Sequence, residues 1–529
     1  MLRILNLNIP LDYTDALLKT ICSRKLHCSP SDILSIQIAH QAVDARNKAN
    51  VHFVVNLDVH LRHEASALKR LPPNISVAPE YLEPSFPSYA GKKRPLVVGA
   101  GPAGLFAALV LAKAGACPIL IERGKSVDDR AADVHEMFEH GRLNSESNVQ
   151  FGEGGAGAFS YGKLTTGIKS PYLPFVFRTF VEHGAPEEIL TSAKPHIGTD
   201  RLRPTIASMR KEIQRLGGTV WFSTCLLELE LHEQTVIGAF LMKDNARIHI
   251  ETDSVVLCIG HSSRDTFETL HHQGVHMIAK PFAVGVRIEH PQKLINQIQY
   301  GPSWDHPRLG AAPYKLNVHT ADGRGVYTFC MCPGGYVVPS ASEPDSVCVN
   351  GMSNYARNGE NANAALLVGI RPEDFPPDHV MAGFQFQRDL EKKAFQLGGG
   401  GYKAPVQRLE DFLLRRPSKH IGSVEPTYRP GYALADLHEC LPIFVADNLR
   451  TSLALLDRQM HGFAYPDAIL TGVEARSSCP VRLPRSLNGT SESISGLYPA
   501  GEGAGYAGGI VSAAVDGINQ AMHVLNGVS

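Results

Sequence analysis

The chain has 529 residues, enough for three or four domains, and its 43% hydrophobic and 19% charged residues are ordinary values for a folded protein. Lys and Arg number 51 against 52 Asp and Glu, and this balance argues against a nucleic-acid or anionic-membrane surface, which would need a basic excess. Glycine is in excess, with 48 residues or about 9% of the chain, so the positions of the glycines matter.

The cysteines and the apolar runs bear on the compartment. Ten cysteines in a chain of this length are too few for a disulfide scaffold. The sequence has no apolar run of the roughly 18 residues that a membrane span requires, and Asn6, Asn8 and Pro10 interrupt the start of the chain before a signal-peptide core could form. We therefore expect a soluble protein of the reducing cytoplasm, with no membrane span and no nucleic acid as partner.

Residues 1–90 are predicted to form a separate α/β unit. Residues 2–9 are strand-like, residues 15–25 have helical spacing, and residues 33–40 and 51–61 alternate as a strand pair. Residues 74–91, rich in Pro, Ser and Tyr, are predicted to be a linker. The order favours a ferredoxin-like β-α-β-β arrangement. Its five histidines, at positions 27, 40, 52, 60 and 63, lack ligand spacing and are interpreted as scattered surface residues.

Residues 94–124 carry the most informative pattern. A short apolar strand at 96–98 runs directly into Gly99-Ala100-Gly101-Pro102-Ala103-Gly104. A predicted helix at 105–114 and a second strand at 117–122 complete a strand–turn–helix–strand unit. Because every part stands at the expected place, the unit predicts a dinucleotide-binding site.

Each residue type in this unit has a mechanical reason. Gly99 permits the tight turn, Gly101 lets the backbone approach a pyrophosphate, and Gly104 lets the helix pack on the sheet. The helix N-terminus offers unpaired N–H groups to the phosphates. Glu122 ends the second strand, where a carboxylate can accept the hydroxyls of an adenosine ribose and disfavours a 2′-phosphate. FAD or NAD is therefore preferred over NADP.

Two later segments favour FAD over NAD. A helix at 205–216 and a β-meander at 220–231, 236–242 and 247–251 lead to a strand ending in glycine at 252–260. Residues 496–522 then form a short strand, a glycine-rich turn and a long helix with small residues. This turn, with glycines at 501, 503, 505, 508 and 509, is a second cradle before a helix. Two cradles about 400 residues apart suit one elongated cofactor.

At this point the chain resembles the glutathione-reductase-type flavoproteins, and more closely a family of FAD-dependent dehydrogenases with an added N-terminal α/β domain. The matching stretches are NVQFGEGGAGAFSYGKLTTG (148–167), GHSSRDTFETLHHQGV (260–275), KPFAVGVRIEHPQ (280–292), YTFCMCPGGYVVPSASE (327–343), VNGMSNYARNGENANAAL (349–366) and GEGAGYAGGI (501–510). One position departs from the family pattern, because Tyr161 stands where such families usually carry an aspartate.

The resemblance implies a set of cofactor-binding residues. Gly99, Gly101, Pro102, Ala103 and Gly104 would contact the pyrophosphate, and Glu122 and Arg123 would hold the adenosine side. Gly155 belongs to a glycine-rich loop (152–157) that follows no predicted strand; we interpret this loop as approaching the cofactor closely, with a plain flexible loop as the alternative. Gly501 and Glu502 would lie by the ribityl and pyrophosphate part, and Gly509 and Ile510 would present backbone N–H groups to the flavin ring. Arg130 is a further candidate for an FAD contact, with a solvated residue on a helix as the alternative.

Other clusters carry weaker predictions. Residues 398–401 are glycine-rich but follow a predicted helix at 384–395 rather than a strand, so we interpret them as a loop, and the chain shows no independent NAD(P)H domain. NAD(P)H would bind transiently at the flavin face, or electrons would arrive and leave by another route. Cys330 and Cys332 would share one face of a strand; we favour buried structural thiols over a redox pair. His271, His272 and His276 cluster near Gly274, and we favour a helix end over a metal site.

Together these patterns predict a fold class and a function. The fold is an α/β protein: an N-terminal unit (1–90), a discontinuous Rossmann-type FAD domain (91–276 and 461–529) and an inserted, mostly β substrate domain (277–460). The function is an FAD-dependent oxidoreductase, dehydrogenase or reductase, that acts on a small organic substrate. The alternative is a flavin-binding component of an RNA-modifying or other assembly without redox turnover of its own. No catalytic side chain is named, and no metal is expected.

Overall fold

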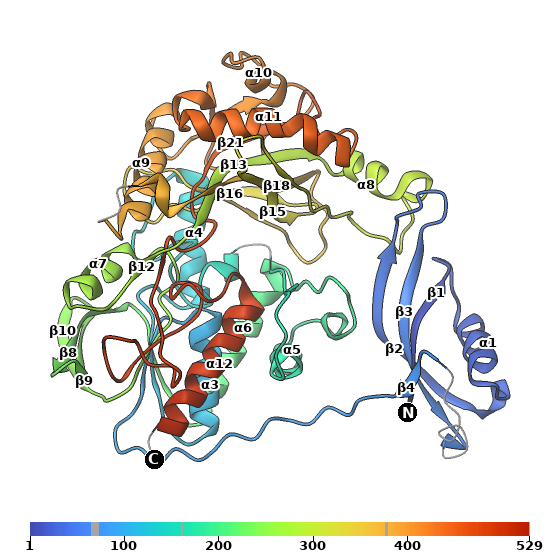
Figure 1. The fold of residues 1–529 in the computed structure, drawn as a ribbon, viewed down its shortest axis with the longest axis horizontal. Helices are drawn as coiled ribbons and strands as arrows, with labels where there is room; N and C mark the ends of the chain where they lie inside the picture. The colour runs from blue at the N-terminus through green and yellow to red at the C-terminus, as the bar shows by residue number, and fades with distance from the viewer. Residues whose placement is uncertain (65–72, 160–161, 376–378, 528–529) are drawn as a thin grey trace.

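The structure is a computed structural model that describes residues 1–64, 73–159, 162–375 and 379–527. Figure 1 shows three parts: an N-terminal unit at one end, a domain built on a parallel sheet, and a domain built on a larger, mostly antiparallel sheet. Within the described residues, no helix has the length and apolar character to cross a membrane.

The N-terminal unit is a four-stranded sheet with one helix in its described part. Its elements are β1 (Leu2–Ile9), α1 (Asp15–Leu26), β2 (Ile33–Asp44), β3 (His52–Leu61) and β4 (Ile75–Val77), and the strand order is β2-β3-β1-β4. The linker prediction was wrong at its start, because β4 pairs antiparallel with β1. A ferredoxin-like fold stays a prediction, since part of the segment between β3 and β4 lies outside the described residues.

A five-stranded parallel sheet organises the second part and joins distant regions of the chain. Its strands are β5 (Leu96–Val98), β6 (Ile119–Ile121), β7 (Thr219–Trp221), β11 (Val255–Leu257) and β23 (Leu497–Pro499), in the order β23-β11-β5-β6-β7. Each strand has three residues. All three are buried in β5, β6, β11 and β23, and all three are half-buried in the edge strand β7, as expected for a sheet covered on both faces. The predicted discontinuity is therefore observed in this sheet, since β23 comes from the end of the chain.

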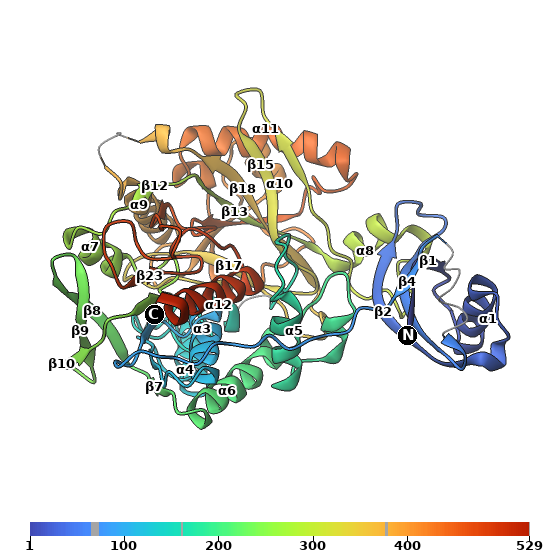
Figure 2. The same ribbon diagram turned by 60° about the horizontal axis from the view of Figure 1, so that its bottom comes forward.

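Helices cover one face of this sheet and a meander covers the other. The helices are α3 (Pro102–Lys113), α5 (Leu173–Glu182), α6 (Thr199–Arg215) and α12 (Ile510–Gly527); the meander is β8 (Thr224–His232), β9 (Thr235–Lys243) and β10 (Ala246–Glu251) with α7 (Arg264–His272). Figure 2 shows α12 beside α3. The single strand predicted at 220–231 was wrong: it is divided into β7 and β8 at Ser223, whose φ of 47° breaks the extended backbone.

The inserted part is built on a seven-stranded sheet. Its order is β14 (Asn317–His319), β15 (Gly325–Cys332), β18 (Asn361–Ile370), β13 (Phe282–Pro291), β21 (Ile469–Glu474), β19 (Ala404–Arg408) and β20 (Tyr432–Leu434). Strand β13 pairs antiparallel with both β18 and β21. Because β21 lies inside this sheet, we propose that the inserted domain ends after Glu474 rather than at residue 460.

Helices and short strands complete the inserted part and its connections. The helices α8 (Gln292–Tyr300), α9 (Ala382–Leu397), α10 (Leu409–Leu413) and α11 (Ile443–Gln459) pack on the sheet. Two further antiparallel strand pairs are β16 (Tyr336–Pro339) with β17 (Val349–Met352), which are close in sequence, and β12 (Ile278–Ala279) with β22 (Val481–Arg482), which are not. α4 (Val127–His140) follows β6 in the parallel-sheet domain.

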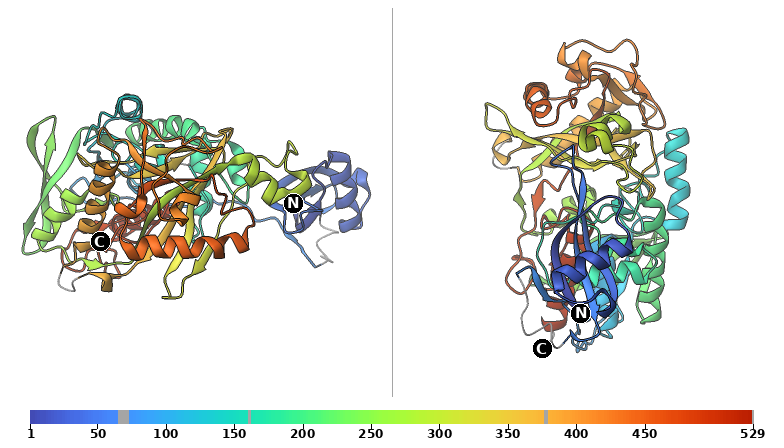
Figure 3. Two further views of the ribbon diagram at one scale, coloured as in Figure 1. Left: turned by 90° about the horizontal axis from the view of Figure 1, so that it is seen from above. Right: turned by 90° about the vertical axis from the view of Figure 1, so that its right-hand side faces the viewer.

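The N-terminal unit packs against the inserted domain. Its core residues and those of the seven-stranded sheet belong to one continuous apolar cluster. Arg308 Nη1 donates to the carbonyls of Leu11 at 3.1 Å and Tyr13 at 2.9 Å, and His306 Nε2 lies 3.1 Å from Asp12 Oδ1. Figure 3 shows this unit projecting from one end of the molecule next to α8.

Candidate functional site

A single cavity joins the parallel-sheet domain to the inserted domain. Its empty space, counted together with the open solvent at its mouth, is about 1440 Å³, and it begins where strands β5, β6 and β11 end. The carboxyl edge of a parallel sheet is where ligands bind in open α/β folds. Eleven of the thirteen predicted cofactor residues line it: Gly99, Gly101, Pro102, Ala103, Glu122, Arg123, Gly155, Gly501, Glu502, Gly509 and Ile510. Gly104 and Arg130 do not line it.

The first glycine turn is tight for the reasons expected of it. Gly99 has a φ of 99°, and a Cβ there would lie 2.4 Å from the carbonyl oxygen of Cys258. A Cβ on Gly104 would lie 1.8 Å from the carbonyl oxygen of Gly99, so α3 sits directly on the turn. A Cβ on Gly101 would meet only Gly155, at 3.8 Å, and Gly101 lines the cavity. Two glycines therefore serve the fold, and Gly101 keeps space open for a ligand.

Two helix N-termini meet at this cavity. The first backbone bonds of α3 and α12 run from Leu105 to Gly101 and from Ala513 to Gly509, which leaves earlier N–H groups outside the helical ladders. A Cβ on Gly517 of α12 would lie 2.0 Å from the carbonyl oxygen of Ala103 in α3. This close crossing holds the two helices together, so both positive dipole ends serve the same cavity.

Glu122 ties the first turn to the glycine-rich loop at 152–157. Its carboxylate accepts hydrogen bonds from the backbone N–H of Ala100 at 2.8 Å, Gly124 at 3.0 Å and Gly152 at 2.9 Å. The side chain is buried and lines the cavity. Glu122 therefore holds the backbone at the edge of the cavity in place and also lines the cavity itself.

Arg130 lies beneath the loop rather than in the cavity. Its guanidinium donates to four backbone carbonyls, those of Asn148, Val149, Glu153 and Gly155, at 2.7 to 2.9 Å. The side chain is fully buried, so the alternative of a solvated helix residue was wrong. Its observed role is to hold the loop that brings Gly155 to the cavity.

Arg123 lies beside Glu122 at one edge of the cavity. It makes paired bonds of 2.9 to 3.0 Å with the carboxylates of Glu146 and Asp265, and its guanidinium lies 4.3 Å from the ring centroid of Phe151. These contacts hold the arginine in one orientation, since planar guanidinium groups bind carboxylates in a two-pronged geometry. Arg123 and Phe151 both line the cavity.

The other end of the cavity is formed by the inserted sheet, and sequence reasoning missed its central pair. Arg287 Nη1 donates to Glu474 Oε2 at 2.7 Å, and both side chains are buried. Arg287 also donates to the carbonyl oxygen of Cys330 at 2.6 Å and to Asn363 Oδ1 at 2.8 Å. Glu474, Cys330, Asn350 and Gly351 line the cavity. Only their places in buried strand-like runs could have indicated this site.

The two neighbouring thiols do not face the cavity together. A register shift between Phe329 and Cys332 inserts a bulge into β15, and Cys330 has a φ of 40°. Cys330 therefore lines the cavity while Cys332 is fully buried. Burial raises the pKa of Cys330 to about 12 and that of Cys332 to about 11, so both remain protonated thiols.

Glu502 and His261 form a titratable pair in the middle of the cavity. His261 Nε2 lies 3.9 Å from Glu502 Oε1, and both residues line the cavity. Burial raises the pKa of Glu502 to about 7, against the lowering effect of Lys280. Burial, with the charges of Arg476 and Arg264, lowers the pKa of His261 to about 3. Near neutral pH the histidine is therefore uncharged, and the carboxyl group is poised between its two forms.

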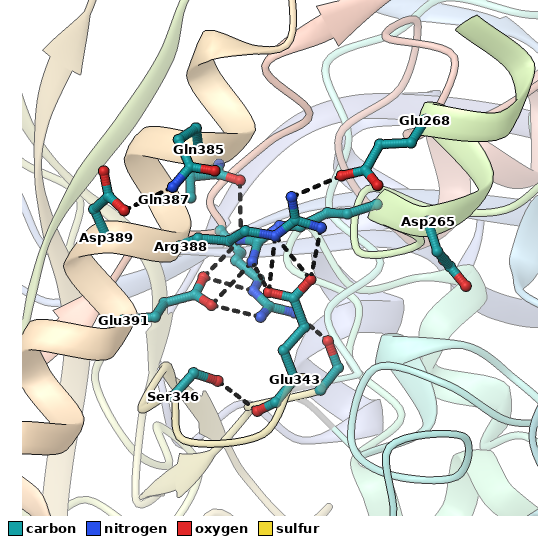
Figure 4. A network of polar contacts seen from close by, with 12 residues as sticks. Asp265, Glu268, Glu343, Ser346, Gln385, Gln387, Arg388, Asp389 and Glu391 are labelled. Atoms are coloured by element: carbon teal, nitrogen blue, oxygen red, sulfur yellow. Dashed lines mark hydrogen bonds and ion pairs between the residues drawn. The ribbon is translucent and has the colours of Figure 1, made fainter. Parts of the chain in front are cut away.

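A buried ionic cluster joins the two domains beside the cavity (Figure 4). Glu391 of α9 accepts from Arg264 of α7 at 2.8 Å and 3.1 Å and from Arg476 at 2.8 Å and 2.6 Å. Burial opposes ionisation, but the two arginines lower the pKa of Glu391 to about 2. Farther out, Arg388 contacts Glu343 and Glu268. The cluster binds helix α7 to helix α9, and Arg476 also lines the cavity.

The remaining sequence predictions fall outside the cavity. His271 and His272 end α7, His276 lies beyond it, and no group of three or more His, Cys, Asp or Glu in the described part of the chain could hold a metal ion. Residues 398–401 follow α9 and do not line the cavity. Tyr161 lies outside the described residues.

Comparison with known proteins gives three family matches along the chain. Residues 1–60 match a domain of unknown function, residues 93–272 match an FAD binding domain, and residues 281–477 match the C-terminal domain of FAD-dependent proteins. An uncharacterized protein of Clostridium beijerinckii is 47% identical over 530 residues, which cover 99% of this chain and 98% of that protein.

Solved structures give weaker similarities. A geranylgeranyl bacteriochlorophyll reductase-like protein of Thermoplasma acidophilum is 13% identical, with 84% of this chain and 79% of that chain covered and a TM-score of 0.36. Glycine oxidase of Bacillus cereus is 10% identical, with 83% and 96% covered and a TM-score of 0.33. Both scores are too low to define a shared fold.

The residues present fit FAD. The cavity offers two helix N-termini, a glycine at which a side chain would fill the space, and a buried carboxylate beside the first turn. The FAD binding domain matches the region that supplies the first helix N-terminus, and the C-terminal family match covers the inserted sheet. FAD is the cofactor, and the chain belongs to the family of FAD-dependent proteins that it shares with its Clostridium beijerinckii relative.

Proposed function

We propose that this flavoprotein is an FAD-dependent oxidoreductase that acts on a small organic substrate between the parallel-sheet domain and the inserted domain. One observation carries the proposal: a single cavity has two helix N-termini at one end and a face of the inserted sheet at the other. The end with the helix N-termini suits a diphosphate. The end formed by the inserted sheet offers polar side chains for a separate substrate.

Each group of residues in the cavity has its own task. Gly99, Gly101, Pro102 and Ala103 bind the pyrophosphate at the start of α3, and Gly104 supports that turn from beneath. Glu122 and Arg123 face the adenosine, Gly155 approaches the cofactor from the loop that Arg130 holds, and Gly501 and Glu502 lie along its middle. Gly509 and Ile510, at the start of α12, face the flavin ring and stabilise negative charge there.

FAD supplies the electron-pair chemistry when bound, and the protein supplies position and a water-poor enclosure. The cavity closes on one side through the buried cluster of Arg264, Glu391 and Arg476, which holds the inserted domain against α7. A substrate at the inserted sheet would be held within reach of the flavin, and positioning of this kind is a large part of the barrier reduction in such enzymes.

The electron partner would reach the flavin through the same cavity. In the described residues the glycine-rich turns at 99–104 and 501–509 both line one cavity at the edge of the parallel sheet. NAD(P)H would therefore bind transiently at the flavin face rather than in a domain of its own. The same site would serve a dehydrogenase or a reductase direction.

Anaerobic reduction of the purified yellow protein tests the proposal. We expect NADH, NADPH or members of a panel of small alcohols, amines, acids and aldehydes to bleach the flavin absorbance, and oxidised acceptors to restore it. Failure of every compound while FAD stays bound would exclude turnover of this kind. An RNA or protein partner that co-purifies and is released by altering residues 1–90 would then favour the assembly component.

A further inference from the structure

Glu474 is a buried carboxylate with one oxygen committed and one oxygen available. It ends strand β21, is 5% exposed, and lines the cavity. Oε2 accepts the hydrogen bond from Arg287. Oε1 has no hydrogen-bond partner among the described residues, and it is not among their fully buried polar atoms that lack a partner, so it is accessible from the cavity. An acceptor of this kind inside a ligand cavity calls for a donor on the ligand.

The surroundings fix this carboxylate in place. Arg287 donates to four acceptors, Asn363 Oδ1, Glu474 Oε2, the Cys330 carbonyl and Cys332 Sγ, and these contacts hold its guanidinium on the Oε2 side of Glu474. A Cβ on Gly351 would lie 2.1 Å from Arg287 Nη2, so glycine alone leaves room for the guanidinium. Arg287 is thus a positioning residue: it fixes the orientation of the Glu474 carboxylate, as a catalytic base requires.

The other two carboxylates of the cavity are arranged differently. Glu122 uses both oxygens on backbone N–H groups at the adenosine side. Glu502 stands in the turn after β23, opposite His261. Glu474 alone among the three comes from the inserted sheet, beside Cys330 and Asn350, which is the end left for a substrate.

We propose that Glu474 Oε1 accepts the hydrogen bond and then the proton of a substrate O–H or N–H group, so that the substrates are alcohols or amines. The inference rests on the proposed function. Oxidation of such a substrate breaks its O–H or N–H bond and the C–H bond of the neighbouring carbon, and forms C=O or C=N. The proton goes to Glu474 Oε1, and FAD is the oxidant that takes the hydride.

The charged and titratable groups around Glu474 suit this role. Arg287 faces it from β13, the thiols of Cys330 and Cys332 lie on β15, and that of Cys348 precedes β17. Burial raises the pKa of Glu474, and the charge of Arg287 opposes that rise. A glutamate with a raised pKa is a stronger proton acceptor once ionised, and it changes form closer to neutral pH.

The test compares three variants of the FAD-loaded protein. E474Q removes the proton acceptor but keeps an oxygen for Arg287, and E474D keeps a carboxylate. E410Q changes a half-buried glutamate of α10 that pairs with Arg408 and does not line the cavity. Anaerobic flavin bleaching is followed with primary alcohols and primary amines across the neutral pH range. FAD content and reduction by dithionite report on folding and on the flavin itself.

We expect wild type and E410Q to be bleached at equal rates that rise with pH, because the ionised carboxylate is the active form. E474Q should be about 10²- to 10⁴-fold slower and lose that pH dependence, with FAD content and dithionite reduction unchanged. E474D should be slower than wild type yet keep the pH dependence. Equal rates and equal pH profiles for E474Q and wild type would overturn the role of Glu474.

A second measurement separates this inference from the proposed function. Infrared difference spectra of wild type minus E474Q should show a carboxyl group that titrates above the usual range of a glutamate and changes when 2-aminoethanol is added. If no compound bleaches the wild-type flavin, the proposed function fails, but this signal would still support Glu474 as the ligand acceptor. Its absence would overturn the inference whatever the flavin does.

Discussion

At the scale of single residues, two glycines of the first turn offer a matched pair of substitutions. In G104A the new methyl group would lie 1.8 Å from the backbone oxygen of Gly99, so the turn and α3 must move apart. We expect the protein without FAD to lose about 2–3 kcal/mol of unfolding free energy. In G101A the nearest atom is 3.8 Å away, so that stability should stay unchanged.

The same pair separates folding from cofactor binding. The methyl group of G101A projects toward the cavity, so we expect FAD affinity to fall about 10- to 100-fold while the unfolding curve without FAD matches wild type. Fluorescence titration with FAD and urea unfolding measure the two quantities. Loss of stability in G101A, or a stable G104A, would contradict the assignment of these two glycines.

Glu502 gives a pH prediction with a defined sign. Its pKa rises from 4.5 to about 7 on folding, because the folded protein disfavours the charged form. The favourable contribution is complete below about pH 4.5 and is lost as the pH rises through about 7. We expect the unfolding free energy of the FAD-free protein to fall by about 2–3 kcal/mol between these two pH values. In E502Q the fall over the same pH range should be smaller by about 2–3 kcal/mol, because the glutamine does not ionise. Urea unfolding at a series of pH values checks it.

The sequence could identify residues that follow a local rule. Gly99, Gly101 and Glu122 occupy positions defined by the strand–turn–helix–strand pattern, and the cavity includes all three. Arg130 and Glu474 follow no local rule, because their partners are backbone carbonyls and an arginine brought together only by folding. No spacing along the chain relates Glu474 to Arg287, 187 residues earlier.

At the scale of elements, the ion cluster between α7 and α9 should be more costly to break at its centre than at its edge. E391Q leaves Arg476 buried with a neutral partner and Arg264 with Glu343 as its one remaining charged partner among the described residues, and we expect a loss of about 3–5 kcal/mol of unfolding free energy. E268Q removes a partly exposed contact to Arg388 and should cost less than about 1 kcal/mol. Denaturant unfolding of both variants compares them directly; equal effects would refute the buried centre as the stabilising contact.

Periodicity predicted most of the elements but missed local breaks in them. The strands at 2–9 and 96–98 and the helix at 15–25 were confirmed within one residue, because each has a clear apolar pattern. The division between β7 and β8 was missed, since Ser223 carries no glycine or proline signal for its positive φ. The bulge in β15 was missed for the same reason, and with it the different surroundings of Cys330 and Cys332.

At the scale of the whole molecule, the return of the C-terminal segment to the first sheet was predictable and the docking of the N-terminal unit was not. Two glycine cradles imply a single cofactor, so β23 and α12 had to come back to β5 and α3. The docking of the N-terminal unit depends on surface contacts that no sequence motif indicates. Arg308 meets the 11–13 segment, and Gln41 of β2 exchanges backbone bonds with Thr191 and Ala193 at 2.8 and 2.9 Å. The N-terminal unit thus contacts both other parts of the chain.

This bridging position gives a prediction for the whole molecule. R308A removes two hydrogen bonds to the carbonyls of Leu11 and Tyr13 and a guanidinium that lies 4.6 Å from the Tyr13 ring centroid. We expect the unit to open more often, with amide exchange near residues 11–13 about 10- to 100-fold faster, since about 1–3 kcal/mol of local contact is lost. FAD absorbance should stay unchanged, because the described residues of the unit do not line the cavity. Arg24, exposed on α1, supplies the control R24A, which should exchange as wild type does. Faster exchange in R24A, or loss of FAD from R308A, would contradict an interface that holds the unit without touching the cofactor.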